Sequence, residues 1–292
     1  MDSIFVKAYA KINLHLDVIS KAENGYHEVK TVMQTVSLCD DVEVALSDGE
    51  SNSIYCNVSS VPTDSKNLAW RAAELFFEKC NVSKKADIRI TKRIPVAAGL
   101  AGGSTDAAAV FFALNELCGR PLSSDELFAL GARLGADVPF CIAGGTHFAD
   151  GYGERLHDYP AMPGCYIVVA CGKDGVSTPW AYSTLDEKYG NFAEGAYSPR
   201  STDELEVAMK NADIKQVASC IYNVFEIAIE PHRPDVTRIK SVMLKHGAEN
   251  AMMSGSGPSV FGIYTDEKKA KEATAELCNM GIDAFFTEPV CR

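Results

Sequence analysis

The chain contains 292 residues, of which 47% are hydrophobic and 23% are charged, and it carries a formal net charge of −11. This composition is that of a globular protein long enough to bury a sizeable core in two modest domains. The acidic balance disfavours nucleic acid or an anionic membrane as a main partner, because both would repel the chain.

The sequence pattern predicts neither a secretion signal nor a membrane-spanning segment. The longest clearly apolar run, Cys165 to Cys171, is too short to span a bilayer. Residues 1–5 lack a positive region followed by an apolar core. The ten cysteines include no Cys-x-x-Cys pair, which favours reduced thiols and disfavours a structural zinc site. We therefore expect a cytoplasmic protein.

Residues 11–18 alternate strictly between polar and apolar side chains, which predicts a half-buried strand. Side chains two residues apart share one face of a strand, so Lys11 and Asn13 project together. This face is either a solvated surface or part of a site.

Asn24-Gly25 predicts a tight turn after this strand. Tyr26 and His27 follow at the start of a second strand-like run. An aromatic residue and a histidine at a hairpin tip are either exposed decoration or part of a pocket.

The rest of the chain reads as alternating short strands and amphipathic helices, with a soft domain boundary near residues 160–164. Ser123 and Glu126 fit a capping box at the start of a helix that ends near Gly135. Strands are predicted over 42–46, 53–58, 87–94, 166–170, 260–264 and 283–287, a hairpin over 143–153, a loop over 189–203, and helices over 67–79, 204–209, 214–228, 234–245 and 266–279.

Residues 95–105, here called the glycine loop, connect the strand over 87–94 to a predicted helix. We expect Ser104 or Thr105 to cap that helix through its hydroxyl. Small residues let the backbone approach a ligand, and bare amides at a helix N-terminus attract anions. The loop therefore predicts a phosphate site, against the alternative of a tight turn without a ligand.

Asp137 follows the helix end at Gly135 among small and apolar neighbours, where an unpartnered carboxylate is costly to bury. It either caps a nearby amide or faces the glycine loop. A second glycine stretch, 253–259, precedes a strand and so is not a dinucleotide fingerprint. The glycine loop is not a P-loop, because no lysine follows its last glycine. Neither stretch has the spacing of a hydrolase nucleophile elbow.

Three stretches, 7–17, 95–108 and 253–260, resemble in sequence and order the GHMP kinases, the family of galacto-, homoserine, mevalonate and phosphomevalonate kinases. The resemblance covers essentially the whole chain. It implies an α+β, two-domain fold with mixed sheets, helices packed on one side and a deep cleft between domains. The implied N-terminal domain, 1–160, holds the ATP-phosphate loop and catalytic residues, and the C-terminal domain, 161–292, adds substrate-site residues and the second glycine stretch.

Further motifs narrow the resemblance to one branch of the family: 8–14, 25–27, 135–140 and 177–179. That branch transfers the γ-phosphate of ATP to the 2-hydroxyl of a methylerythritol unit carrying a diphosphocytidyl group, in non-mevalonate isoprenoid-precursor synthesis. The alternatives are a mevalonate- or homoserine-type kinase and a catalytically silent nucleotide-binding regulator. The resemblance implies small-molecule partners, no nucleic acid or membrane, and a monomer or weak homodimer.

The resemblance also assigns roles to residues that match the family's motifs. Lys11 and Asp137 match its catalytic pair, and Asn13 matches a polar contact near the substrate phosphates. Tyr26 and His27 match the cytidine pocket. Thr178 matches a further substrate contact. Tyr182 matches the position of a second aromatic that stacks on cytosine, with Trp180 as the alternative for that position.

Matching positions for ATP are the whole glycine loop together with Asn67 and Lys92 on the adenine side. The loop positions are Pro95, Val96, Ala97, Ala98, Gly99, Leu100, Ala101, Gly102, Gly103, Ser104 and Thr105. Magnesium is expected to bridge the ATP phosphates, with Ser104 or Thr105 as a possible ligand. Ala97 and Ala101 stand where many members have glycine, so we expect the loop to keep φ negative there or to shift slightly.

Overall fold

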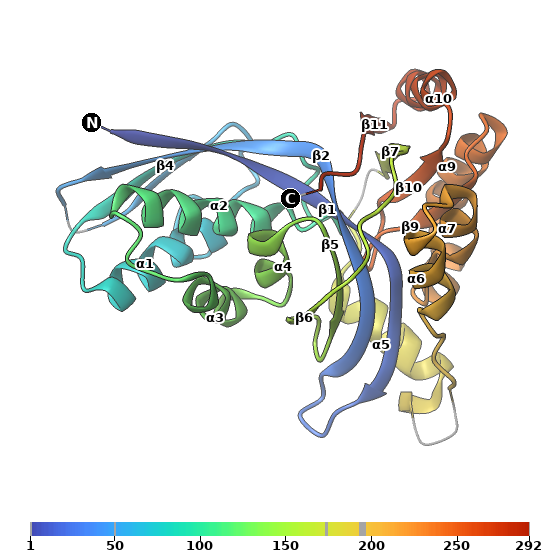
Figure 1. Ribbon diagram of the computed structural model, residues 1–292, viewed down its shortest axis with the longest axis horizontal. Coiled ribbons are helices and arrows are strands. Elements are labelled where there is room, and N and C mark those ends of the chain that lie inside the picture. The colour runs from blue at the N-terminus through green and yellow to red at the C-terminus, as the bar shows by residue number, and fades with distance from the viewer. Residues whose placement is uncertain (1, 50, 173–174, 193–196, 292) are drawn as a thin grey trace. The chain divides into compact units, whose positions relative to one another are not determined.

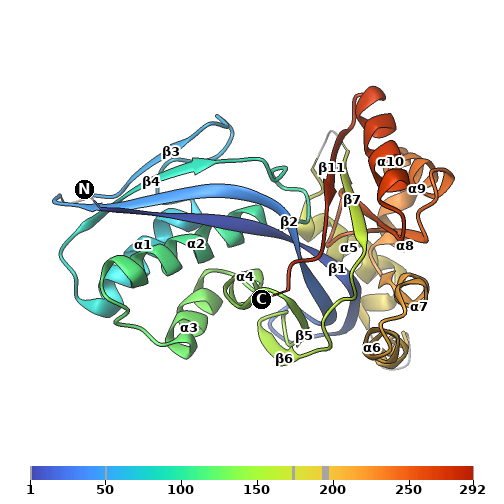
Figure 2. The same ribbon diagram turned by 45° about the horizontal axis from the view of Figure 1, so that its top comes forward.

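The structure is a computed structural model that describes residues 2–49, 51–172, 175–192 and 197–291. It confirms the predicted α+β class, with helices and two β-sheets (Figures 1 and 2). The chain forms two compact units, neither of which is one continuous stretch. Unit 1 comprises Met1–Ala10, Cys39–Val96 and Ala101–Ala143, and unit 2 comprises Lys11–Leu38, Ala97–Leu100 and Gly144–Arg292. The sequence domains 1–160 and 161–292 stay a prediction.

Two long strands, β1 (Ser3–Lys21) and β2 (His27–Ser47), contribute residues to both units. The strand-like run predicted after Tyr26 and His27 and the strand predicted over 42–46 both belong to β2. The other elements of unit 1 are β3 (Ser53–Cys56), α1 (Leu68–Cys80), β4 (Lys85–Thr91), α2 (Gly102–Leu117), α3 (Ser124–Leu134) and α4 (Asp137–Ala143).

The larger sheet has the strand order β3-β4-β2-β1-β8, and β5 (Thr146–Asp150) pairs with both β2 and β6 (Arg155–Asp158). In unit 1, β2 pairs antiparallel with β4 from Asp41↔Thr91 to Ser47↔Lys85. In unit 2, β5 and β6 form the predicted hairpin, although its first strand starts at Thr146 and not at residue 143.

The core of unit 1 lies between one face of its strands and its helices, as Figure 2 shows. Val42, Val44, Ile88 and Ile90 alternate with exposed or half-buried neighbours and turn their side chains into this core. From α2, Val110, Phe111 and Leu114 lie at one-face helical spacing and are buried, whereas Leu117 is only half-buried. Such a one-sided apolar stripe is what anchors a helix to a sheet.

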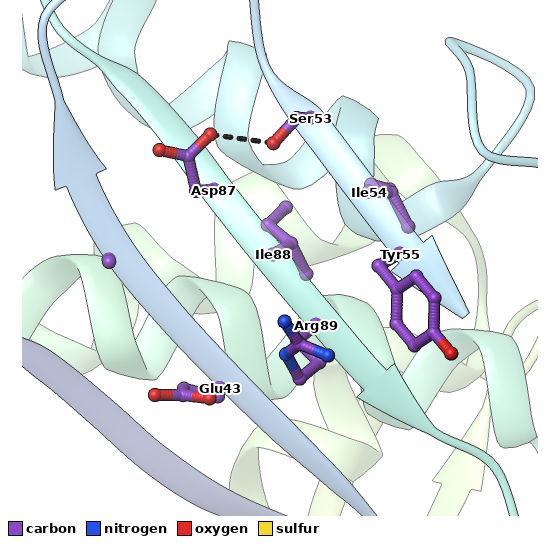
Figure 3. A pocket seen from close by; sticks show the side chains of 8 residues that line it. Glu43, Ser53, Ile54, Tyr55, Asp87, Ile88 and Arg89 are labelled. Carbon is purple, nitrogen blue, oxygen red and sulfur yellow. Dashed lines mark hydrogen bonds between the residues drawn. The ribbon is translucent and has the colours of Figure 1, made fainter. Parts of the chain in front are cut away.

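The other face of these strands is open to solvent and forms a shallow hollow of about 410 Å³ (Figure 3). Its side chains include Glu43, Tyr55, Asp87 and Arg89. The Arg89 guanidinium lies 4.9 Å from the centre of the Tyr55 ring. Charged and aromatic side chains thus contact one another on this face, in contrast to the apolar face beneath the helices.

Unit 2 is built around the second sheet, whose strand order is β11-β7-β10-β9. Buried side chains of this sheet pack against α9 and α10. The helices contribute Ile239 and Met243 from α9 and Leu277 from α10. The elements of unit 2 that follow β6 are β7 (Tyr166–Cys171), α5 (Thr178–Lys188), α6 (Asp203–Lys210), α7 (Ile214–Cys220), β8 (Tyr222–Asn223), α8 (Glu226–Ile229), α9 (Pro234–Lys245), β9 (Asn250–Met253), β10 (Val260–Tyr264), α10 (Glu267–Asn279) and β11 (Asp283–Thr287), with short 3-10 turns at Gly190–Phe192 and Glu230–His232.

The single helix predicted over 214–228 is wrong. It is interrupted by β8, whose residues Tyr222 and Asn223 pair with β1. The Asn223 amide donates to the carbonyls of Met253 and Gly255, at 2.7 and 2.8 Å. These long-range bonds compete successfully with the local helical pattern, which is a weak prior.

The loop predicted over 189–203 contains a short 3-10 turn and the first residue of α6, and its residues 193–196 lie outside the described residues. The predictions left out α5. Within the described part of the chain, no helix combines the length and apolar character needed to cross a membrane.

Candidate functional site

Between residues 97 and 101 of the glycine loop, every second residue has a left-handed backbone. Ala97, Gly99 and Ala101 have φ values of 53°, 76° and 59°. Of the two alternatives expected for these alanines, a negative φ is therefore wrong, and a slight shift of the loop stays a prediction. Alternation of left-handed with ordinary residues turns successive N–H groups toward one concave side, which is an anion-binding arrangement. The left-handed conformation costs an alanine roughly 1 kcal/mol, so the rest of the structure holds the loop in this shape.

Helix α2 begins at Gly102, with Ala101 at its N-cap, earlier than the sequence predicted. Ser104 and Thr105 lie inside the first turn, so the prediction that one of them caps the helix is wrong. Alanine offers no side-chain acceptor at the N-cap. The first N–H groups of the helix therefore lack a side-chain cap and keep their attraction for an anion.

The second glycine stretch supports residues 97–100 of the loop within unit 2. The Ser254 hydroxyl donates to the carbonyl of Gly99 at 3.1 Å. A Cβ on Gly99 would lie 2.3 Å from the Ser254 carbonyl oxygen, so only glycine fits there. The second glycine stretch, for which the sequence predicted no detailed role, thus supports the backbone of the glycine loop.

Lys11 and Asn13 lie together on one face of β1, as predicted. The prediction that the strand over residues 11–18 is half-buried is wrong, because all of these residues are buried. The Lys11 ammonium donates to Asn13 Oδ1 at 2.7 Å, and the Asn13 amide donates to the Thr31 hydroxyl at 2.8 Å. The Lys11 backbone N–H also donates to the carbonyl of Leu100 in the glycine loop. Both side chains are less than 5% exposed, so the solvated-surface alternative is wrong.

His15 continues this face and was not singled out by the sequence. Its ring is buried against Tyr222, and its Nε2 has no hydrogen-bond partner among the described residues. Burial, helped by the positive charges of Arg200 and Lys30, lowers the pKa of His15 to about 4. The ring is therefore neutral in the folded protein at neutral pH.

Lys92, predicted on the adenine side, lies in a buried charge cluster with two aspartates. Its ammonium contacts Asp40 at 2.5 Å and Asp106 at 2.8 Å. Asp40 also accepts the backbone N–H of Ile94 at 2.8 Å. A Cβ on Gly102 would lie 3.0 Å from the Lys92 ammonium. The cluster thus ties the chain entering the glycine loop to the helix leaving it.

Sequence reasoning missed Asp40 and Asp106, although Asp106 stands two residues after Ser104 within the motif. Burial raises the pKa of the Asp106 carboxyl to about 7 against the opposing charge of Lys92. Burial alone would lower the pKa of Lys92, but the Asp106 and Asp40 charges outweigh it and raise that pKa. Lys92 is therefore a charged, already engaged cation.

Asn67 and Asp137 occupy helix starts in unit 1. Asn67 caps α1, since its side chain accepts from the backbone N–H of Ala69 at 2.9 Å. Its predicted contact with ATP is an additional role that stays a prediction. Asp137 is half-buried in the first turn of α4, where the helix dipole favours a carboxylate.

His27 is held in unit 2 by contacts on two sides. Its Nε2 lies 2.6 Å from an Asp186 carboxylate oxygen, and its ring stacks on Tyr182 with centroids 4.6 Å apart. Tyr26 beside it is 67% exposed. The pair therefore combines a fixed imidazole with an open aromatic face, which suits a planar polar ligand.

The remaining aromatic and hydroxyl predictions fall on α5. Tyr182 joins the His27 cluster, whereas Trp180 packs edge-on against His232. The Thr178 and Ser256 hydroxyls lie 3.0 Å apart, which links the start of α5 to the second glycine stretch. These contacts favour Tyr182 over Trp180 as the second stacking aromatic, while its role in binding stays a prediction.

The chain belongs to the GHMP kinase family. Residues 67–145 match the family model described as GHMP kinases N terminal domain, and residues 205–283 match the one described as GHMP kinases C terminal. The protein is thus a member of a family of small-molecule kinases, as its motifs indicate.

Two curated relatives that cover most of this chain share one name. The chain is 42% identical to 4-diphosphocytidyl-2-C-methyl-D-erythritol kinase of Lachnoclostridium phytofermentans, over 94% of this chain and 93% of that protein. It is 43% identical to the kinase of the same name from Acetivibrio thermocellus, over 99% and 100%. A crystal structure of 4-(cytidine 5'-diphospho)-2C-methyl-D-erythritol kinase superposes with a TM-score of 0.80 and 31% identity, covering 98% of this chain and 99% of the other.

The left-handed alanines give a first prediction. Ala101→Gly removes the cost of the left-handed Cβ but adds chain entropy to the unfolded state, so its free energy of unfolding stays within about 0.5 kcal/mol of wild type. Ala98→Gly is the matched control, because Ala98 is buried and outside the left-handed set, and it loses about 1 kcal/mol. Urea denaturation measures both. An equal loss in the two variants would contradict the left-handed conformation of Ala101.

His15 predicts a pH dependence of stability. The unfolded chain protonates this histidine near its ordinary pKa of 6.5, whereas the folded protein does so near 4. Stability from His15 is thus complete above pH 6.5 and is lost as the pH falls toward 4, by about 3 kcal/mol. His15→Phe, which keeps an aromatic ring, lacks this loss. Urea denaturation at several pH values from 7 to 4 measures the free energy of unfolding of both proteins. The same pH dependence in the two would contradict this prediction.

Proposed function

We propose that this protein is an ATP-dependent kinase that phosphorylates the 2-hydroxyl of 4-diphosphocytidyl-2-C-methyl-D-erythritol, in the non-mevalonate route to isoprenoid precursors. The observation that carries this choice within the family is His27, held by Asp186 and stacked on Tyr182 beside the open ring of Tyr26. An aromatic face and a fixed imidazole suit a cytosine base. The whole-chain relatives named for this reaction support the same choice.

In this proposal the glycine loop binds the β- and γ-phosphates of ATP. Its alternating left-handed residues and the uncapped N-terminus of α2 supply N–H donors that need no reorganisation when the anion arrives. The Lys92 ammonium lies near Gly102 but is paired with Asp40 and Asp106, so this cluster holds the turn in place and adds no net positive charge. Phosphoryl transfer depends mainly on such positioning and charge stabilisation.

Lys11 and Asp137 act on the transferred group and the accepting hydroxyl. Asp137 accepts the proton of the 2-hydroxyl, or orients that hydroxyl, as its oxygen attacks the γ-phosphorus. The bond from that phosphorus to the bridging oxygen breaks, and ADP leaves with the electron pair. Lys11, fixed by Asn13 at 2.7 Å, offsets the charge that develops on the moving phosphoryl group.

Magnesium fits this site as an ion held chiefly by the nucleotide. Among the described residues, no group of three or more His, Cys, Asp or Glu side chains could hold a metal on its own. Mg²⁺ in kinases commonly takes one or two protein oxygens together with phosphates and water. Ser104 is the better protein ligand, since it is half-buried in the first turn of α2 whereas Thr105 is buried. When bound, the ion neutralises charge on the phosphates.

The proposal describes a cytoplasmic enzyme with small-molecule partners, active as a monomer or weak homodimer. The runner-up is a GHMP kinase for mevalonate or homoserine, and a silent nucleotide-binding regulator is the alternative outside catalysis.

The deciding experiment measures ADP release with a panel of alcohols. We expect turnover with 4-diphosphocytidyl-2-C-methyl-D-erythritol and at least about 100-fold lower kcat/KM for mevalonate and homoserine, since both lack the base. Preference for either of those identifies the runner-up. ATP binding without turnover of any alcohol identifies the regulator.

Asp137→Ala tests the proton acceptor. We expect kcat to fall by a factor of about 10² to 10⁴, the usual contribution of a general base, while ATP binding measured by calorimetry stays within about twofold of wild type. Asp125→Ala is the matched control, an exposed aspartate in the first turn of α3 that keeps wild-type turnover. A wild-type kcat in Asp137→Ala would refute the role.

A further inference from the structure

Tyr152 lies in the turn between β5 and β6 and contacts the ring of Tyr26 in the turn between β1 and β2. The two ring centroids are 5.5 Å apart, with planes inclined by 56°. Tyr26 is 67% exposed and Tyr152 is 41% exposed. Two neighbouring tyrosine rings left this open form a surface suited to an aromatic ligand.

Asn24 joins the two turns through its side-chain amide. Its Oδ1 accepts the backbone N–H of Tyr26 at 3.0 Å, and its Nδ2 donates to the Tyr152 hydroxyl at 2.8 Å. The turn of Tyr152 is fastened as well, because Glu154 accepts the Tyr152 N–H at 2.7 Å and the Gly151 carbonyl accepts the N–H of Val29 at 2.8 Å. Tyr152 is thus fixed at its backbone and at its hydroxyl.

The ring geometry excludes one role for Tyr152. A base inserted between two rings needs their planes parallel and about 7 Å apart, twice the ordinary contact distance. The Tyr26 and Tyr152 rings are too close and too tilted for that. Tyr152 therefore supports the Tyr26 ring by contact, while most of Tyr26 stays exposed to a ligand.

We propose that Tyr152 is a positioning residue for the cytidine substrate, which holds the Tyr26 ring in the orientation that stacks on the cytosine base. This inference rests on the proposed function. An exposed tyrosine ring otherwise samples several rotamers, and binding must then restrict it at a cost in affinity. Contact with a fixed neighbour removes that cost in advance. Tyr152 acts through Tyr26 and needs no contact with the substrate.

The test is a double-mutant cycle with steady-state kinetics of the full-length enzyme. Tyr152→Ala raises KM for 4-diphosphocytidyl-2-C-methyl-D-erythritol about three- to tenfold, the cost of ordering one side chain, while kcat and KM for ATP change less than about twofold. Tyr152→Phe keeps the ring and restores most of the affinity. Tyr55→Ala is the matched control, since Tyr55 is an exposed tyrosine of unit 1 outside this site, and it leaves all three constants unchanged.

The decisive step places Tyr152→Ala in the Tyr26→Ala background. Because Tyr152 acts through Tyr26, the second substitution adds no further rise in KM. Multiplying effects would overturn the inference and assign Tyr152 a direct contact. Wild-type KM in Tyr152→Ala would also overturn it, with the proposed function intact. If the alanine variant is unstable, Tyr152→Leu reports the loss of the ring instead. No turnover of the cytidyl substrate by the wild type would refute the proposed function itself.

Discussion

The strained backbone of the glycine loop is the constraint on which the rest of the candidate site depends. Three left-handed residues in five, two of them alanine, turn the amides of this stretch to one side. Such a shape persists only where neighbouring contacts over-determine it. In unit 2 those contacts come from Ser254 at Gly99 and from the backbone of Lys11 at Leu100. In unit 1 the Lys92 charge cluster joins the chain before the loop to the helix after it.

Strand β1 links the chemistry of the site to recognition of the substrate. Its buried face carries Lys11, Asn13 and His15, and its far end leads into the turn of Asn24 and Tyr26. A strand is a stiff support with a fixed side-chain period, so the cation and the aromatic turn keep a defined spacing along it. In the proposed function, Lys11 acts at the phosphoryl-accepting end of the substrate and Tyr26 acts at its base. The buried polar face is costly unless its groups are bonded, and the bonds from Lys11 to Asn13 and from Asn13 to Thr31 meet most of that requirement.

Local patterns were sufficient wherever a segment's own periodicity and caps decide its structure. The helix over Pro234–Lys245, the strands over Val260–Tyr264 and Asp283–Thr287, and the capping box of Ser123 with Glu126 were all predicted and are all present. Prediction failed where distant partners decide. The local sequence of residues 214–228 does not predict that the Asn223 side chain donates hydrogen bonds to the carbonyls of Met253 and Gly255. Likewise, the left-handed conformation of Ala97 and Ala101 contradicts the usual preference of alanine and follows from the bracing of the loop.

The amino-acid sequence by itself determined the family, the α+β class, the position of the glycine loop between strand and helix, and the shared face of Lys11 and Asn13. These follow from motif order and from the two-residue period of a strand, which need no knowledge of the fold. Only the tertiary structure decided that Lys92 is engaged by Asp40 and Asp106, that Asp186 and Tyr182 fix His27, and that Tyr152 lies against Tyr26. The residues in each of these groups are far apart in the sequence or separated by turns, so their contacts arise only when the chain folds back on itself.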